Sequence, residues 1–316
     1  MKSGVLLINL GTPDSPAVGD VRKYLREFLM DEKVIDIPFW RRFLLVNLIL
    51  VPCRVFKSAR AYRQLWKAQG HPLKVYGRQV QTLLQQALGV DFQVELAMRY
   101  QDPGIKEALS RFDVKSLERL IIIPLYPQYA SASSGSTIEA VMREIKAWEV
   151  CPELKVVDHF YDHLLFIKAF ADLGRKYMAQ RSYGHYLFSY HGLPEHQEKG
   201  YRAQCFETTR LLAGELGLNE GDYTACFQSR LGNALWIKPY TEETVRRLAQ
   251  RGTKSVLIFA PSFVADCLET NIELGIDYKK IFLDNGGEHW QMVESLNVDP
   301  VWIECLKQLV LQRNLA

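Results

Sequence analysis

The sequence predicts an α/β protein of two halves, each a parallel sheet flanked by helices, with a cleft between the halves. Short apolar runs alternate with segments of helical periodicity, a pattern typical of parallel sheets with helices on both faces. Two cycles of this pattern meet near Cys151-Pro152-Glu153, and 316 residues are enough for two separate cores. We expect domains at residues 1–149 and 150–316, and we leave open that the last helix packs back on the first domain.

The composition narrows the class of protein. The chain is 48% hydrophobic and 24% charged, as globular proteins are. Its net charge of +3 argues against a nucleic-acid partner, because such domains are usually strongly basic. The six cysteines form no CxxC pair, which argues against a zinc module or a redox motif. No signal peptide is recognisable and no apolar run approaches the ~20 residues of a membrane span, so we expect a cytoplasmic protein.

The first half begins with strand Val5–Leu10 and a proline-rich loop. Its other predicted elements are helices Val21–Leu29, Ala59–Ala68 and Lys74–Leu88, strand Phe92–Met98 and the buried strand Leu117–Leu125. The small polar loop Tyr126–Thr137 then enters a helix, and its free N–H groups and hydroxyls suit an anion. Because no GxxxxGK[ST] motif is present, we expect carboxylates or a ring edge as its ligand rather than a nucleotide.

The segment Ile35–Pro52 is apolar nearly all round, yet Arg41 and Arg42 lie in its middle. Two interpretations stay open. The segment is a buried helix with a basic end, or it is an exposed apolar lip that contacts a membrane or a flat hydrophobic ligand. The second is considered because large exposed apolar patches generally mark contact sites.

The second half repeats the pattern and contains the most distinctive stretch, Ser189–Pro194. Its predicted elements are strand Lys155–His159, helix Leu164–Met178, strand His185–Ser189, helix Gly200–Leu216, strand Tyr223–Phe227, helix Glu242–Gln250 and strand Ser255–Ala260. His191 follows a buried strand, and Gly192 and Pro194 place it on a stiff turn where α/β proteins usually bind ligands. Taken alone, His191 is equally well a strand cap or a reactive group.

An acidic stripe follows the strand Ser255–Ala260. On a helix, the side chains at i, i+3, i+7 and i+11 lie along one face, and here these are Asp266, Glu269, Glu273 and Asp277. The stripe is either a solvated helix face or a row of hard oxygen ligands for a divalent cation or a released proton. With His191 in the same cleft, the second interpretation gains support.

Ordered motifs run along nearly the whole chain. They are Leu7–Pro13, Gly70–Leu73, Met98–Tyr100, Tyr126–Tyr129 with Ser134–Ser136, Ser189–Pro194, Gln228–Arg230 with Gly232, Phe263 with Asp266–Thr270, and Glu294–Asn297. Together they resemble the ferrochelatase family, enzymes that insert ferrous iron into a porphyrin in the last steps of haem synthesis. The resemblance implies two Rossmann-like domains of the chelatase type, with the porphyrin between them.

The resemblance also implies roles for individual residues. His191 is the expected active-site histidine and Glu269 the acid that faces it across the porphyrin, and both are expected to meet the metal. Glu273 and Asp277 are the expected outer acids on the metal's path. The expected porphyrin-binding residues are Arg99, Tyr100, Tyr126, Ser131, Ser133, Ser134, Phe227 and Phe39. The implied reaction inserts Fe²⁺ into protoporphyrin IX, releases two pyrrole protons and gives protohaem.

The chain departs from the family at several positions. Phe227 stands where a tryptophan is often found, and Cys267 stands where many members have a histidine. Some members bind a [2Fe–2S] cluster through cysteines in the Tyr-Pro-Gln-Tyr loop and the tail. Here Ser131 occupies the loop and Cys305 is the single tail cysteine, so we expect no cluster and no organic cofactor.

Three alternatives stay open: a coproporphyrin ferrochelatase, a cobalt chelatase of tetrapyrrole metabolism, and a porphyrin or haem carrier without catalysis. Residues Tyr190–Pro194 and the apolar lip favour protoporphyrin. The expected partners are porphyrin and ferrous iron, with no nucleic acid. We expect a monomer that touches the inner face of the membrane transiently through Ile37–Pro52.

Overall fold

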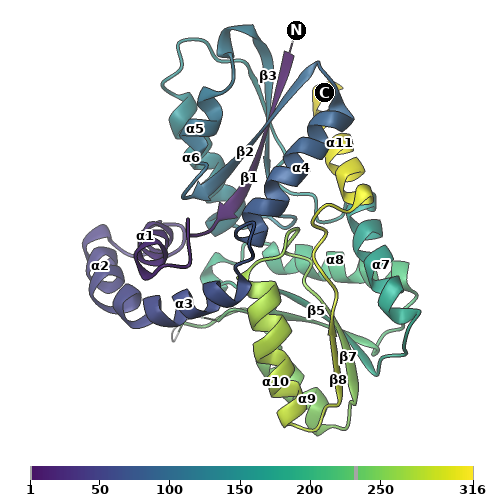
Figure 1. Cartoon of the computed structure of the whole chain (residues 1–316). Coiled ribbons are helices and arrows are strands. Elements are labelled where there is room, and N and C mark those ends of the chain that lie inside the picture. The colour runs from purple at the N-terminus through teal and green to yellow at the C-terminus, as the bar shows by residue number, and fades with distance from the viewer. Residues whose placement is uncertain (1, 231–233, 316) are drawn as a thin grey trace. The chain divides into compact units, whose positions relative to one another are not determined.

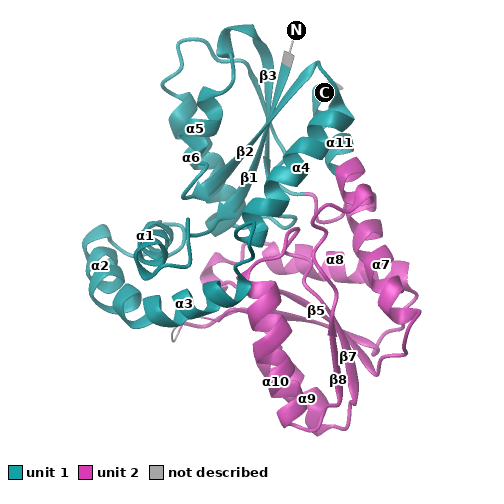
Figure 2. Ribbon diagram, in the orientation of Figure 1, with its two compact units in different colours: residues 1–159, 306–316 teal, residues 160–305 magenta. Residues whose placement is uncertain are grey.

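The computed structural model describes residues 2–230 and 234–315. The chain divides into two compact units (Figures 1 and 2): residues 1–159 with 306–316, and residues 160–305. The division therefore falls after His159 rather than after residue 149, and the end of the chain belongs to unit 1. In the part of the chain that is described, no helix is long and apolar enough to cross a membrane.

Unit 1 is built on a parallel sheet in the order β2-β1-β3-β4. Its strands are β1 (Lys2–Gly11), β2 (Phe92–Tyr100), β3 (Leu117–Pro124) and β4 (Glu153–Val156). Residues 5–8 of β1 and 120–123 of β3 are fully buried, which explains why both strands read as unbroken apolar runs. The strand predicted at Lys155–His159 is β4. It pairs with β3 and completes the first sheet, so it does not open the second half.

Helices cover both faces of this sheet. The helical segments of unit 1 are α1 (Val18–Leu29), α2 (Phe39–Leu44), the π-helix η1 (Leu45–Leu50), α3 (Val51–Leu65), α4 (Pro72–Leu88), α5 (Ile105–Ser110), the short 3₁₀-helix η2 (Val114–Ser116), the π-helix η3 (Ser131–Gly135) and α6 (Ser136–Ile145). Leu6 and Ile8 of β1 pack with α5 and α6 through Ile105 and Val141. The Ala59–Ala68 helix thus begins earlier than predicted, at Val51.

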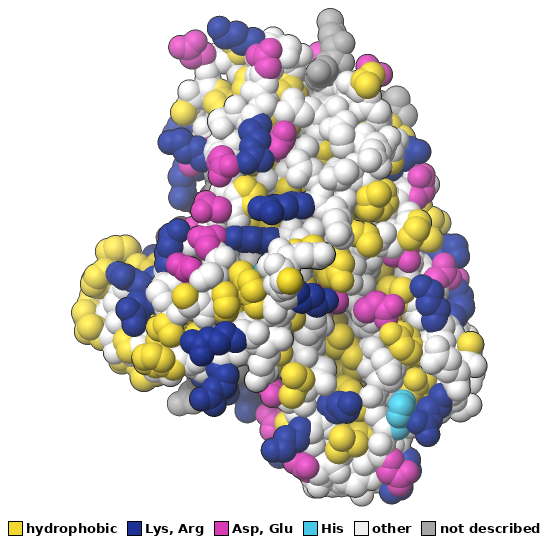
Figure 3. Space-filling view, in the orientation of Figure 1, with side chains coloured by type: hydrophobic (Ala, Val, Ile, Leu, Met, Phe, Trp, Pro, Cys, Tyr) yellow, Lys and Arg dark blue, Asp and Glu magenta, His cyan; other side chains and the backbone are white. Residues whose placement is uncertain are grey.

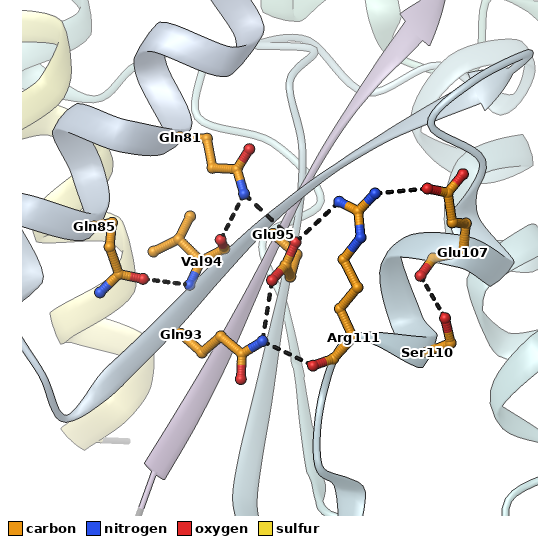
Figure 4. A network of polar contacts seen from close by, with 8 residues as sticks. All are labelled: Gln81, Gln85, Gln93, Val94, Glu95, Glu107, Ser110 and Arg111. Atoms are coloured by element: carbon orange, nitrogen blue, oxygen red, sulfur yellow. Dashed lines mark hydrogen bonds and ion pairs between the residues drawn. The ribbon is translucent and has the colours of Figure 1, made fainter.

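The free edge of β2 is covered by side chains of α4 (Figure 4). Gln81 donates from Nε2 to the Val94 carbonyl over 2.9 Å. Gln85 accepts from the Val94 N–H over 2.9 Å and donates to the Phe92 carbonyl over 3.0 Å. Unpaired edge groups are a template for pairing with another chain, so these two glutamines blunt the edge.

A buried histidine joins α3 to α4. His71 caps α4 by accepting from the Leu73 N–H at Nδ1 over 3.2 Å, and its ring packs against Tyr62 and Trp66 at centroid distances of 5.6 and 5.7 Å. The side chain is 2% exposed. Burial, together with the charge of Lys74, lowers the pKa of His71 to about 3, so the ring is neutral at physiological pH.

Unit 2 repeats the topology of unit 1. Its parallel sheet has the order β6-β5-β7-β8, in which the first two strands along the chain exchange places as they do in unit 1. The strands are β5 (His185–His191), β6 (Tyr223–Gln228), β7 (Ser255–Phe259) and β8 (His289–Met292). The flanking helices are α7 (Leu164–Met178), the short 3₁₀-helix η4 (Glu195–Gln197), α8 (Tyr201–Leu216), α9 (Thr241–Gln250), the π-helix η5 (Glu269–Tyr278) and α10 (Lys279–Asp284).

The last helix, α11 (Pro300–Leu315), begins in unit 2 and ends in unit 1. Within unit 2, Trp302 packs against Phe160 at a ring distance of 5.4 Å. Within unit 1, the Asn314 side chain accepts hydrogen bonds from Ser3 Oγ over 2.9 Å and from Arg119 Nη1 over 3.1 Å. One helix therefore contributes packing to both cores.

Candidate active site

The sheet topology points to one edge of each sheet. In both units the second strand lies on one side of the first strand, and the third strand lies on the other side. The strand order therefore reverses between the first and third strands. α/β proteins bind ligands at such switch points, beyond the carboxyl ends of the strands. His191 ends β5, and the loop after β7 leads to Glu269. In unit 1 the corresponding loops follow β1 and β3, the second of which carries Tyr126 and the serines. The predicted site residues thus form two sets, one in each unit.

His191 is fixed by contacts on both sides of its ring and backbone. Its Nδ1 lies 2.7 Å from the Gly192 carbonyl oxygen, which can only accept, so in the neutral tautomer Nδ1 carries the hydrogen and Nε2 has the lone pair. Tyr201 donates to the His191 carbonyl over 2.9 Å, and the edge of Phe263 faces the ring at 6.3 Å. The half-buried imidazole therefore presents Nε2 as an acceptor.

Gly192 is required by the close approach of two strand ends. A Cβ there would lie 2.7 Å from the backbone oxygen of Gln228 and 3.3 Å from the ring of Trp236. The Gly192 N–H also donates to that oxygen over 2.8 Å. Because Gly192, the residue after His191, has no side chain, the ends of β5 and β6 can lie side by side. This close approach fixes the orientation of His191.

The acidic stripe is shorter than predicted and has a different backbone. Residues Glu269–Tyr278 form a π-helix with wider turns than an α-helix, a form often found at functional sites. Asp266 lies before this helix, is 9% exposed, and accepts from the Ser295 N–H over 3.1 Å. The inclusion of Asp266 in the stripe was therefore wrong, because its carboxylate fixes a turn. Glu269, Glu273 and the exposed Asp277 remain on the helix.

Glu269 and Glu273 differ in how their carboxylates are engaged. Glu273 accepts from the Ser229 N–H, the Ser229 hydroxyl, Gln228 Nε2 and the Tyr278 hydroxyl, at 2.9, 2.6, 3.1 and 2.8 Å. These four bonds fill its acceptor capacity and hold Ser229 at a left-handed φ of 65°. Among the described residues, no nitrogen or oxygen donor is bonded to the Glu269 carboxylate. The Glu269 carboxylate instead meets the thiol of Cys267, a weak donor, so it is engaged by fewer partners than Glu273.

A buried group lies beside each of the two acids, Cys267 beside Glu269 and Tyr278 beside Glu273. Burial, followed by the nearby Glu269 charge, raises the pKa of the Cys267 thiol, so Cys267 stays protonated. Burial and the Glu273 charge likewise raise the pKa of Tyr278. Among residues 2–230 and 234–315, no three His, Cys, Asp or Glu side chains are grouped closely enough to hold a metal ion. Gly232, part of the Gln228–Arg230 motif, lies outside the described residues.

Phe227 lies in the interior of unit 2. It is 2% exposed and packs against Tyr190 and Phe206 at ring distances of 6.2 and 6.1 Å. The expectation that its ring forms a flat wall for the macrocycle does not match this position. Phe227 belongs to β6 and precedes Gln228, which pairs with His191.

In unit 1, Arg99 and Tyr100 converge on a residue that the sequence did not reveal. Asp31 Oδ2 accepts from Arg99 Nη2 over 2.5 Å, from Ser136 Oγ over 2.6 Å and from the Tyr100 hydroxyl over 2.9 Å. Its other oxygen accepts from the Lys33 N–H over 2.8 Å. Burial alone would raise the pKa of Asp31, but these hydrogen bonds and the Arg99 charge hold it below its usual range.

One feature of the sequence could have identified Asp31. It follows the carboxyl end of helix α1, where a negative charge opposes the helix dipole and needs compensation. An acid at that place indicates a cationic partner elsewhere in the chain. Tyr100 is 1% exposed, so of the pair only Arg99 keeps an accessible edge.

The serine-rich loop forms a short π-helix that leads into α6. Ser131 and Ser133 are half-buried in the π-helix Ser131–Gly135, and Ser134 is fully buried with a hydroxyl that has no partner among the described residues. Tyr126 directs its hydroxyl inward beside Thr137, and burial raises the pKa of this tyrosine. These groups stand at the carboxyl end of β3, as predicted.

The segment Ile35–Pro52 is not a fully buried helix: Val46 and Val51 are buried, but much of its apolar surface is exposed. Large apolar side chains that are 45% to 67% exposed lie on α2 and η1: Phe39, Trp40, Phe43, Leu44, Leu48 and Ile49. Figure 3 shows hydrophobic side chains gathered at the end of unit 1 that carries α2. Arg41 stacks over the Trp40 ring at 5.0 Å, whereas Arg42 turns inward and donates to two backbone carbonyls.

Comparison with known proteins gives the family. A ferrochelatase family model matches residues 2–314. The chain belongs to the ferrochelatase family. A ferrochelatase of Legionella pneumophila (strain Lens) is 41% identical, over 98% of this chain and 99% of that protein. Ferrochelatases of Coxiella burnetii (strain Dugway 5J108-111) and Alcanivorax borkumensis are each 39% identical, over 98% of this chain and 93% of theirs.

Solved structures share the ferrochelatase architecture at low identity. SirB from Bacillus subtilis with Fe³⁺ superposes with a TM-score of 0.61 at 10% identity, over 99% of this chain and 96% of SirB. CbiX, described as the terminal enzyme of sirohaem biosynthesis in denitrifying bacteria, gives a TM-score of 0.54 at 12% identity, over 98% of both chains. These similarities confirm the predicted fold class of two parallel sheets flanked by helices.

Proposed function

We propose that this ferrochelatase inserts Fe²⁺ into protoporphyrin IX to make protohaem in haem synthesis, with His191 and Glu269 as its catalytic residues. The observation that carries the assignment of His191 is its hydrogen bond to the Gly192 carbonyl, which leaves Nε2 as the free acceptor. The position of His191 beyond β5, at a switch point of the sheet, supports it further.

The chemistry is a metal-for-proton exchange without oxidation or reduction. The porphyrin gives up two pyrrole N–H protons, Fe²⁺ sheds its water and takes four ring nitrogens as ligands, and two protons leave. A neutral imidazole has a reference pKa of about 6.5 and accepts a proton near neutral pH. His191 Nε2 takes one pyrrole proton, and the Glu269 carboxylate takes a proton or receives the incoming iron by ligand exchange.

The surrounding residues keep these two groups in place. Glu273 uses its four hydrogen bonds to fix the Gln228–Ser229 turn, and Gln228 in turn donates to the Glu269 carbonyl over 3.2 Å. Glu273 therefore positions the start of the π-helix, and Asp277 at its exposed end is where protons or iron exchange with water. A site held in this way loses little energy to reorganisation during the reaction.

The test is anaerobic absorbance spectroscopy of the purified protein with ferrous iron and protoporphyrin. We expect metallation by the wild type, and losses of at least about 100-fold in rate for His191→Ala and Glu269→Gln. His196→Ala and Glu220→Gln, which alter exposed residues of unit 2, are the matched controls. Near-normal insertion by both active-site variants would overturn the assignment.

The same assay separates the other chelatase and carrier functions. Faster insertion into coproporphyrin would reassign the substrate, and cobalt insertion into a reduced tetrapyrrole would favour a cobalt chelatase. Tight porphyrin binding with no metal-dependent absorbance change would favour a carrier. None of these outcomes requires a change to the fold, because the chelatases that it resembles share one architecture.

We propose that the protein is cytoplasmic and binds peripherally to a membrane. The exposed apolar surface of α2 and η1 is the part that contacts the bilayer. Six large apolar side chains within residues 39–49 exceed what an isolated soluble surface usually exposes in one place. Vesicle flotation tests this: we expect Phe39→Ser with Leu48→Ser to lose binding that a Val90→Ser control, with an exposed residue elsewhere in unit 1, retains.

We further propose a monomer without a [2Fe–2S] cluster. Cys305 is fully buried, and its thiol lies 3.2 Å from His163 Nδ1, which engages the one cysteine of the tail. Light scattering of the purified protein tests the monomer. A visible absorbance band with stoichiometric iron and sulfide would contradict the second part of this proposal.

A further inference from the structure

The Asp31 carboxylate accepts four hydrogen bonds within unit 1 and has no role in the chemistry above. A single oxygen, Oδ2, accepts hydrogen bonds from the side chains of Arg99, Tyr100 and Ser136. The first two residues end β2, and Ser136 begins α6. The Asp31 side chain is 6% exposed, and that of Arg99 is 18% exposed. The acid therefore lies below the guanidinium, on the interior side.

The bonds leave one edge of Arg99 for a ligand. Nη2 is held by Asp31, Nε donates to Ser136 Oγ over 2.9 Å, and the guanidinium lies over the Tyr100 ring at 4.6 Å. Nη1 has no hydrogen bond to another residue of the described chain. The Arg99 charge is thus compensated from within, and one donor nitrogen remains.

We propose that Asp31 is a positioning residue that limits how many porphyrin carboxylates can bind near Arg99. Through the two N–H groups of Nη1, Arg99 can bind a ring carboxylate. An uncompensated guanidinium would attract every further carboxylate through its full charge, whereas the Arg99–Asp31 pair does not. The pair therefore favours a porphyrin with two carboxylates over one with four. This inference rests on the proposed function, because it takes Arg99 to face the porphyrin.

The test compares two metal-free porphyrins, protoporphyrin IX with two carboxylates and coproporphyrin III with four. Fluorescence quenching gives the dissociation constant of each, and the anaerobic assay gives kcat/KM with ferrous iron. For Asp31→Asn we expect the affinity ratio to shift about fivefold toward coproporphyrin, with the shift shrinking in high salt. Asp91→Asn, which removes an exposed carboxylate of unit 1, is the matched control and should leave the ratio unchanged.

Two more variants separate charge from damage to the fold. Arg99→Gln leaves the Asp31 charge uncompensated, so the ratio should shift in the opposite direction, toward protoporphyrin. The double variant Asp31→Asn with Arg99→Gln is again neutral and should return the ratio to near the wild-type value. A merely structural role predicts a larger loss in the double variant and no reversal of sign.

The outcomes are distinct for the two proposals. An unchanged ratio in Asp31→Asn, or shifts of the same sign in Asp31→Asn and Arg99→Gln, overturns the inference. If Asp31→Asn does not fold, the sign of the Arg99→Gln shift decides alone. Because the binding ratio needs no metal insertion, a wild type that binds porphyrin without metallating it refutes the proposed function and still tests Asp31.

Discussion

Mild acid should destabilise unit 1 through the buried His71. Its pKa is lowered from 6.5 to about 3 in the folded protein by burial and by Lys74. As the pH falls below about 6.5, the unfolded chain binds a proton that the folded chain does not, so the free energy of unfolding decreases until the pH nears 3. Between about pH 7.5 and pH 5 this one group removes about 2 kcal/mol, from RT ln(1 + 10^1.5).

The variant that isolates this effect is His71→Asn. Asparagine is a favoured N-cap and keeps an acceptor for the Leu73 N–H, but it does not titrate. At pH 7.5 we expect the variant to be about 1–3 kcal/mol less stable, because it loses ring contacts with Tyr62 and Trp66. The difference between wild type and variant should then shrink by about 2 kcal/mol at pH 5.

Urea denaturation followed by circular dichroism at the two pH values measures both quantities. Every other titrating group is common to the two proteins and cancels in the comparison. If wild type and His71→Asn lose the same stability on acidification, to within about 0.5 kcal/mol, the buried neutral histidine is not the acid-sensitive group. The reasoning from burial to pKa would then be refuted.

Three further predictions follow from single contacts. Gly192→Ala places a Cβ 2.7 Å from a backbone oxygen, so we expect about 1–3 kcal/mol of destabilisation and slower iron insertion, whereas Gly214→Ala, with open space around its Cβ inside helix α8, should keep or raise the melting temperature. In Glu273→Gln the new amide NH₂ faces the Ser229 N–H and hydroxyl, which are themselves donors. Calorimetry should show that the free energy of unfolding falls by about 1–3 kcal/mol. Gln81→Ala with Gln85→Ala uncovers the β2 edge, and light scattering should detect concentration-dependent association that the wild type lacks.

The strands could be predicted from the sequence because a strand that is buried on both sheet faces is an unbroken run of apolar residues. Most helices could be predicted from their periodicity. Runs such as residues 120–123 must be apolar in a parallel sheet with two covered faces. The short strand β4 was predicted but assigned to the second half, because the two cycles were taken to meet at Cys151-Pro152-Glu153 just before it, whereas it pairs with β3 in unit 1. The predicted helix Leu164–Met178 coincides with α7, because one clean amphipathic period defines it.

The site was harder to predict where it depends on distant partners. His191 was identified because a strand, a glycine and a proline surround it locally. Asp31 was missed because its partner Arg99 is 68 residues away, a pairing that no local pattern encodes. The π-helix at Glu269 was missed because α- and π-turns use the same residue types and differ only in the hydrogen-bond partner.

The path of α11 has a consequence for the order in which the protein is made. Residues 160–305 form an insertion within unit 1, whose sheet starts with β1 and whose last helical segment starts at Leu306. On the ribosome, unit 2 is fully synthesised before Asn314 can reach Ser3, 311 positions earlier in the chain. Domains usually fold in the order of synthesis, but here the first unit is completed last. A released chain that ends at residue 305 should therefore contain a folded unit 2 and an unfinished unit 1.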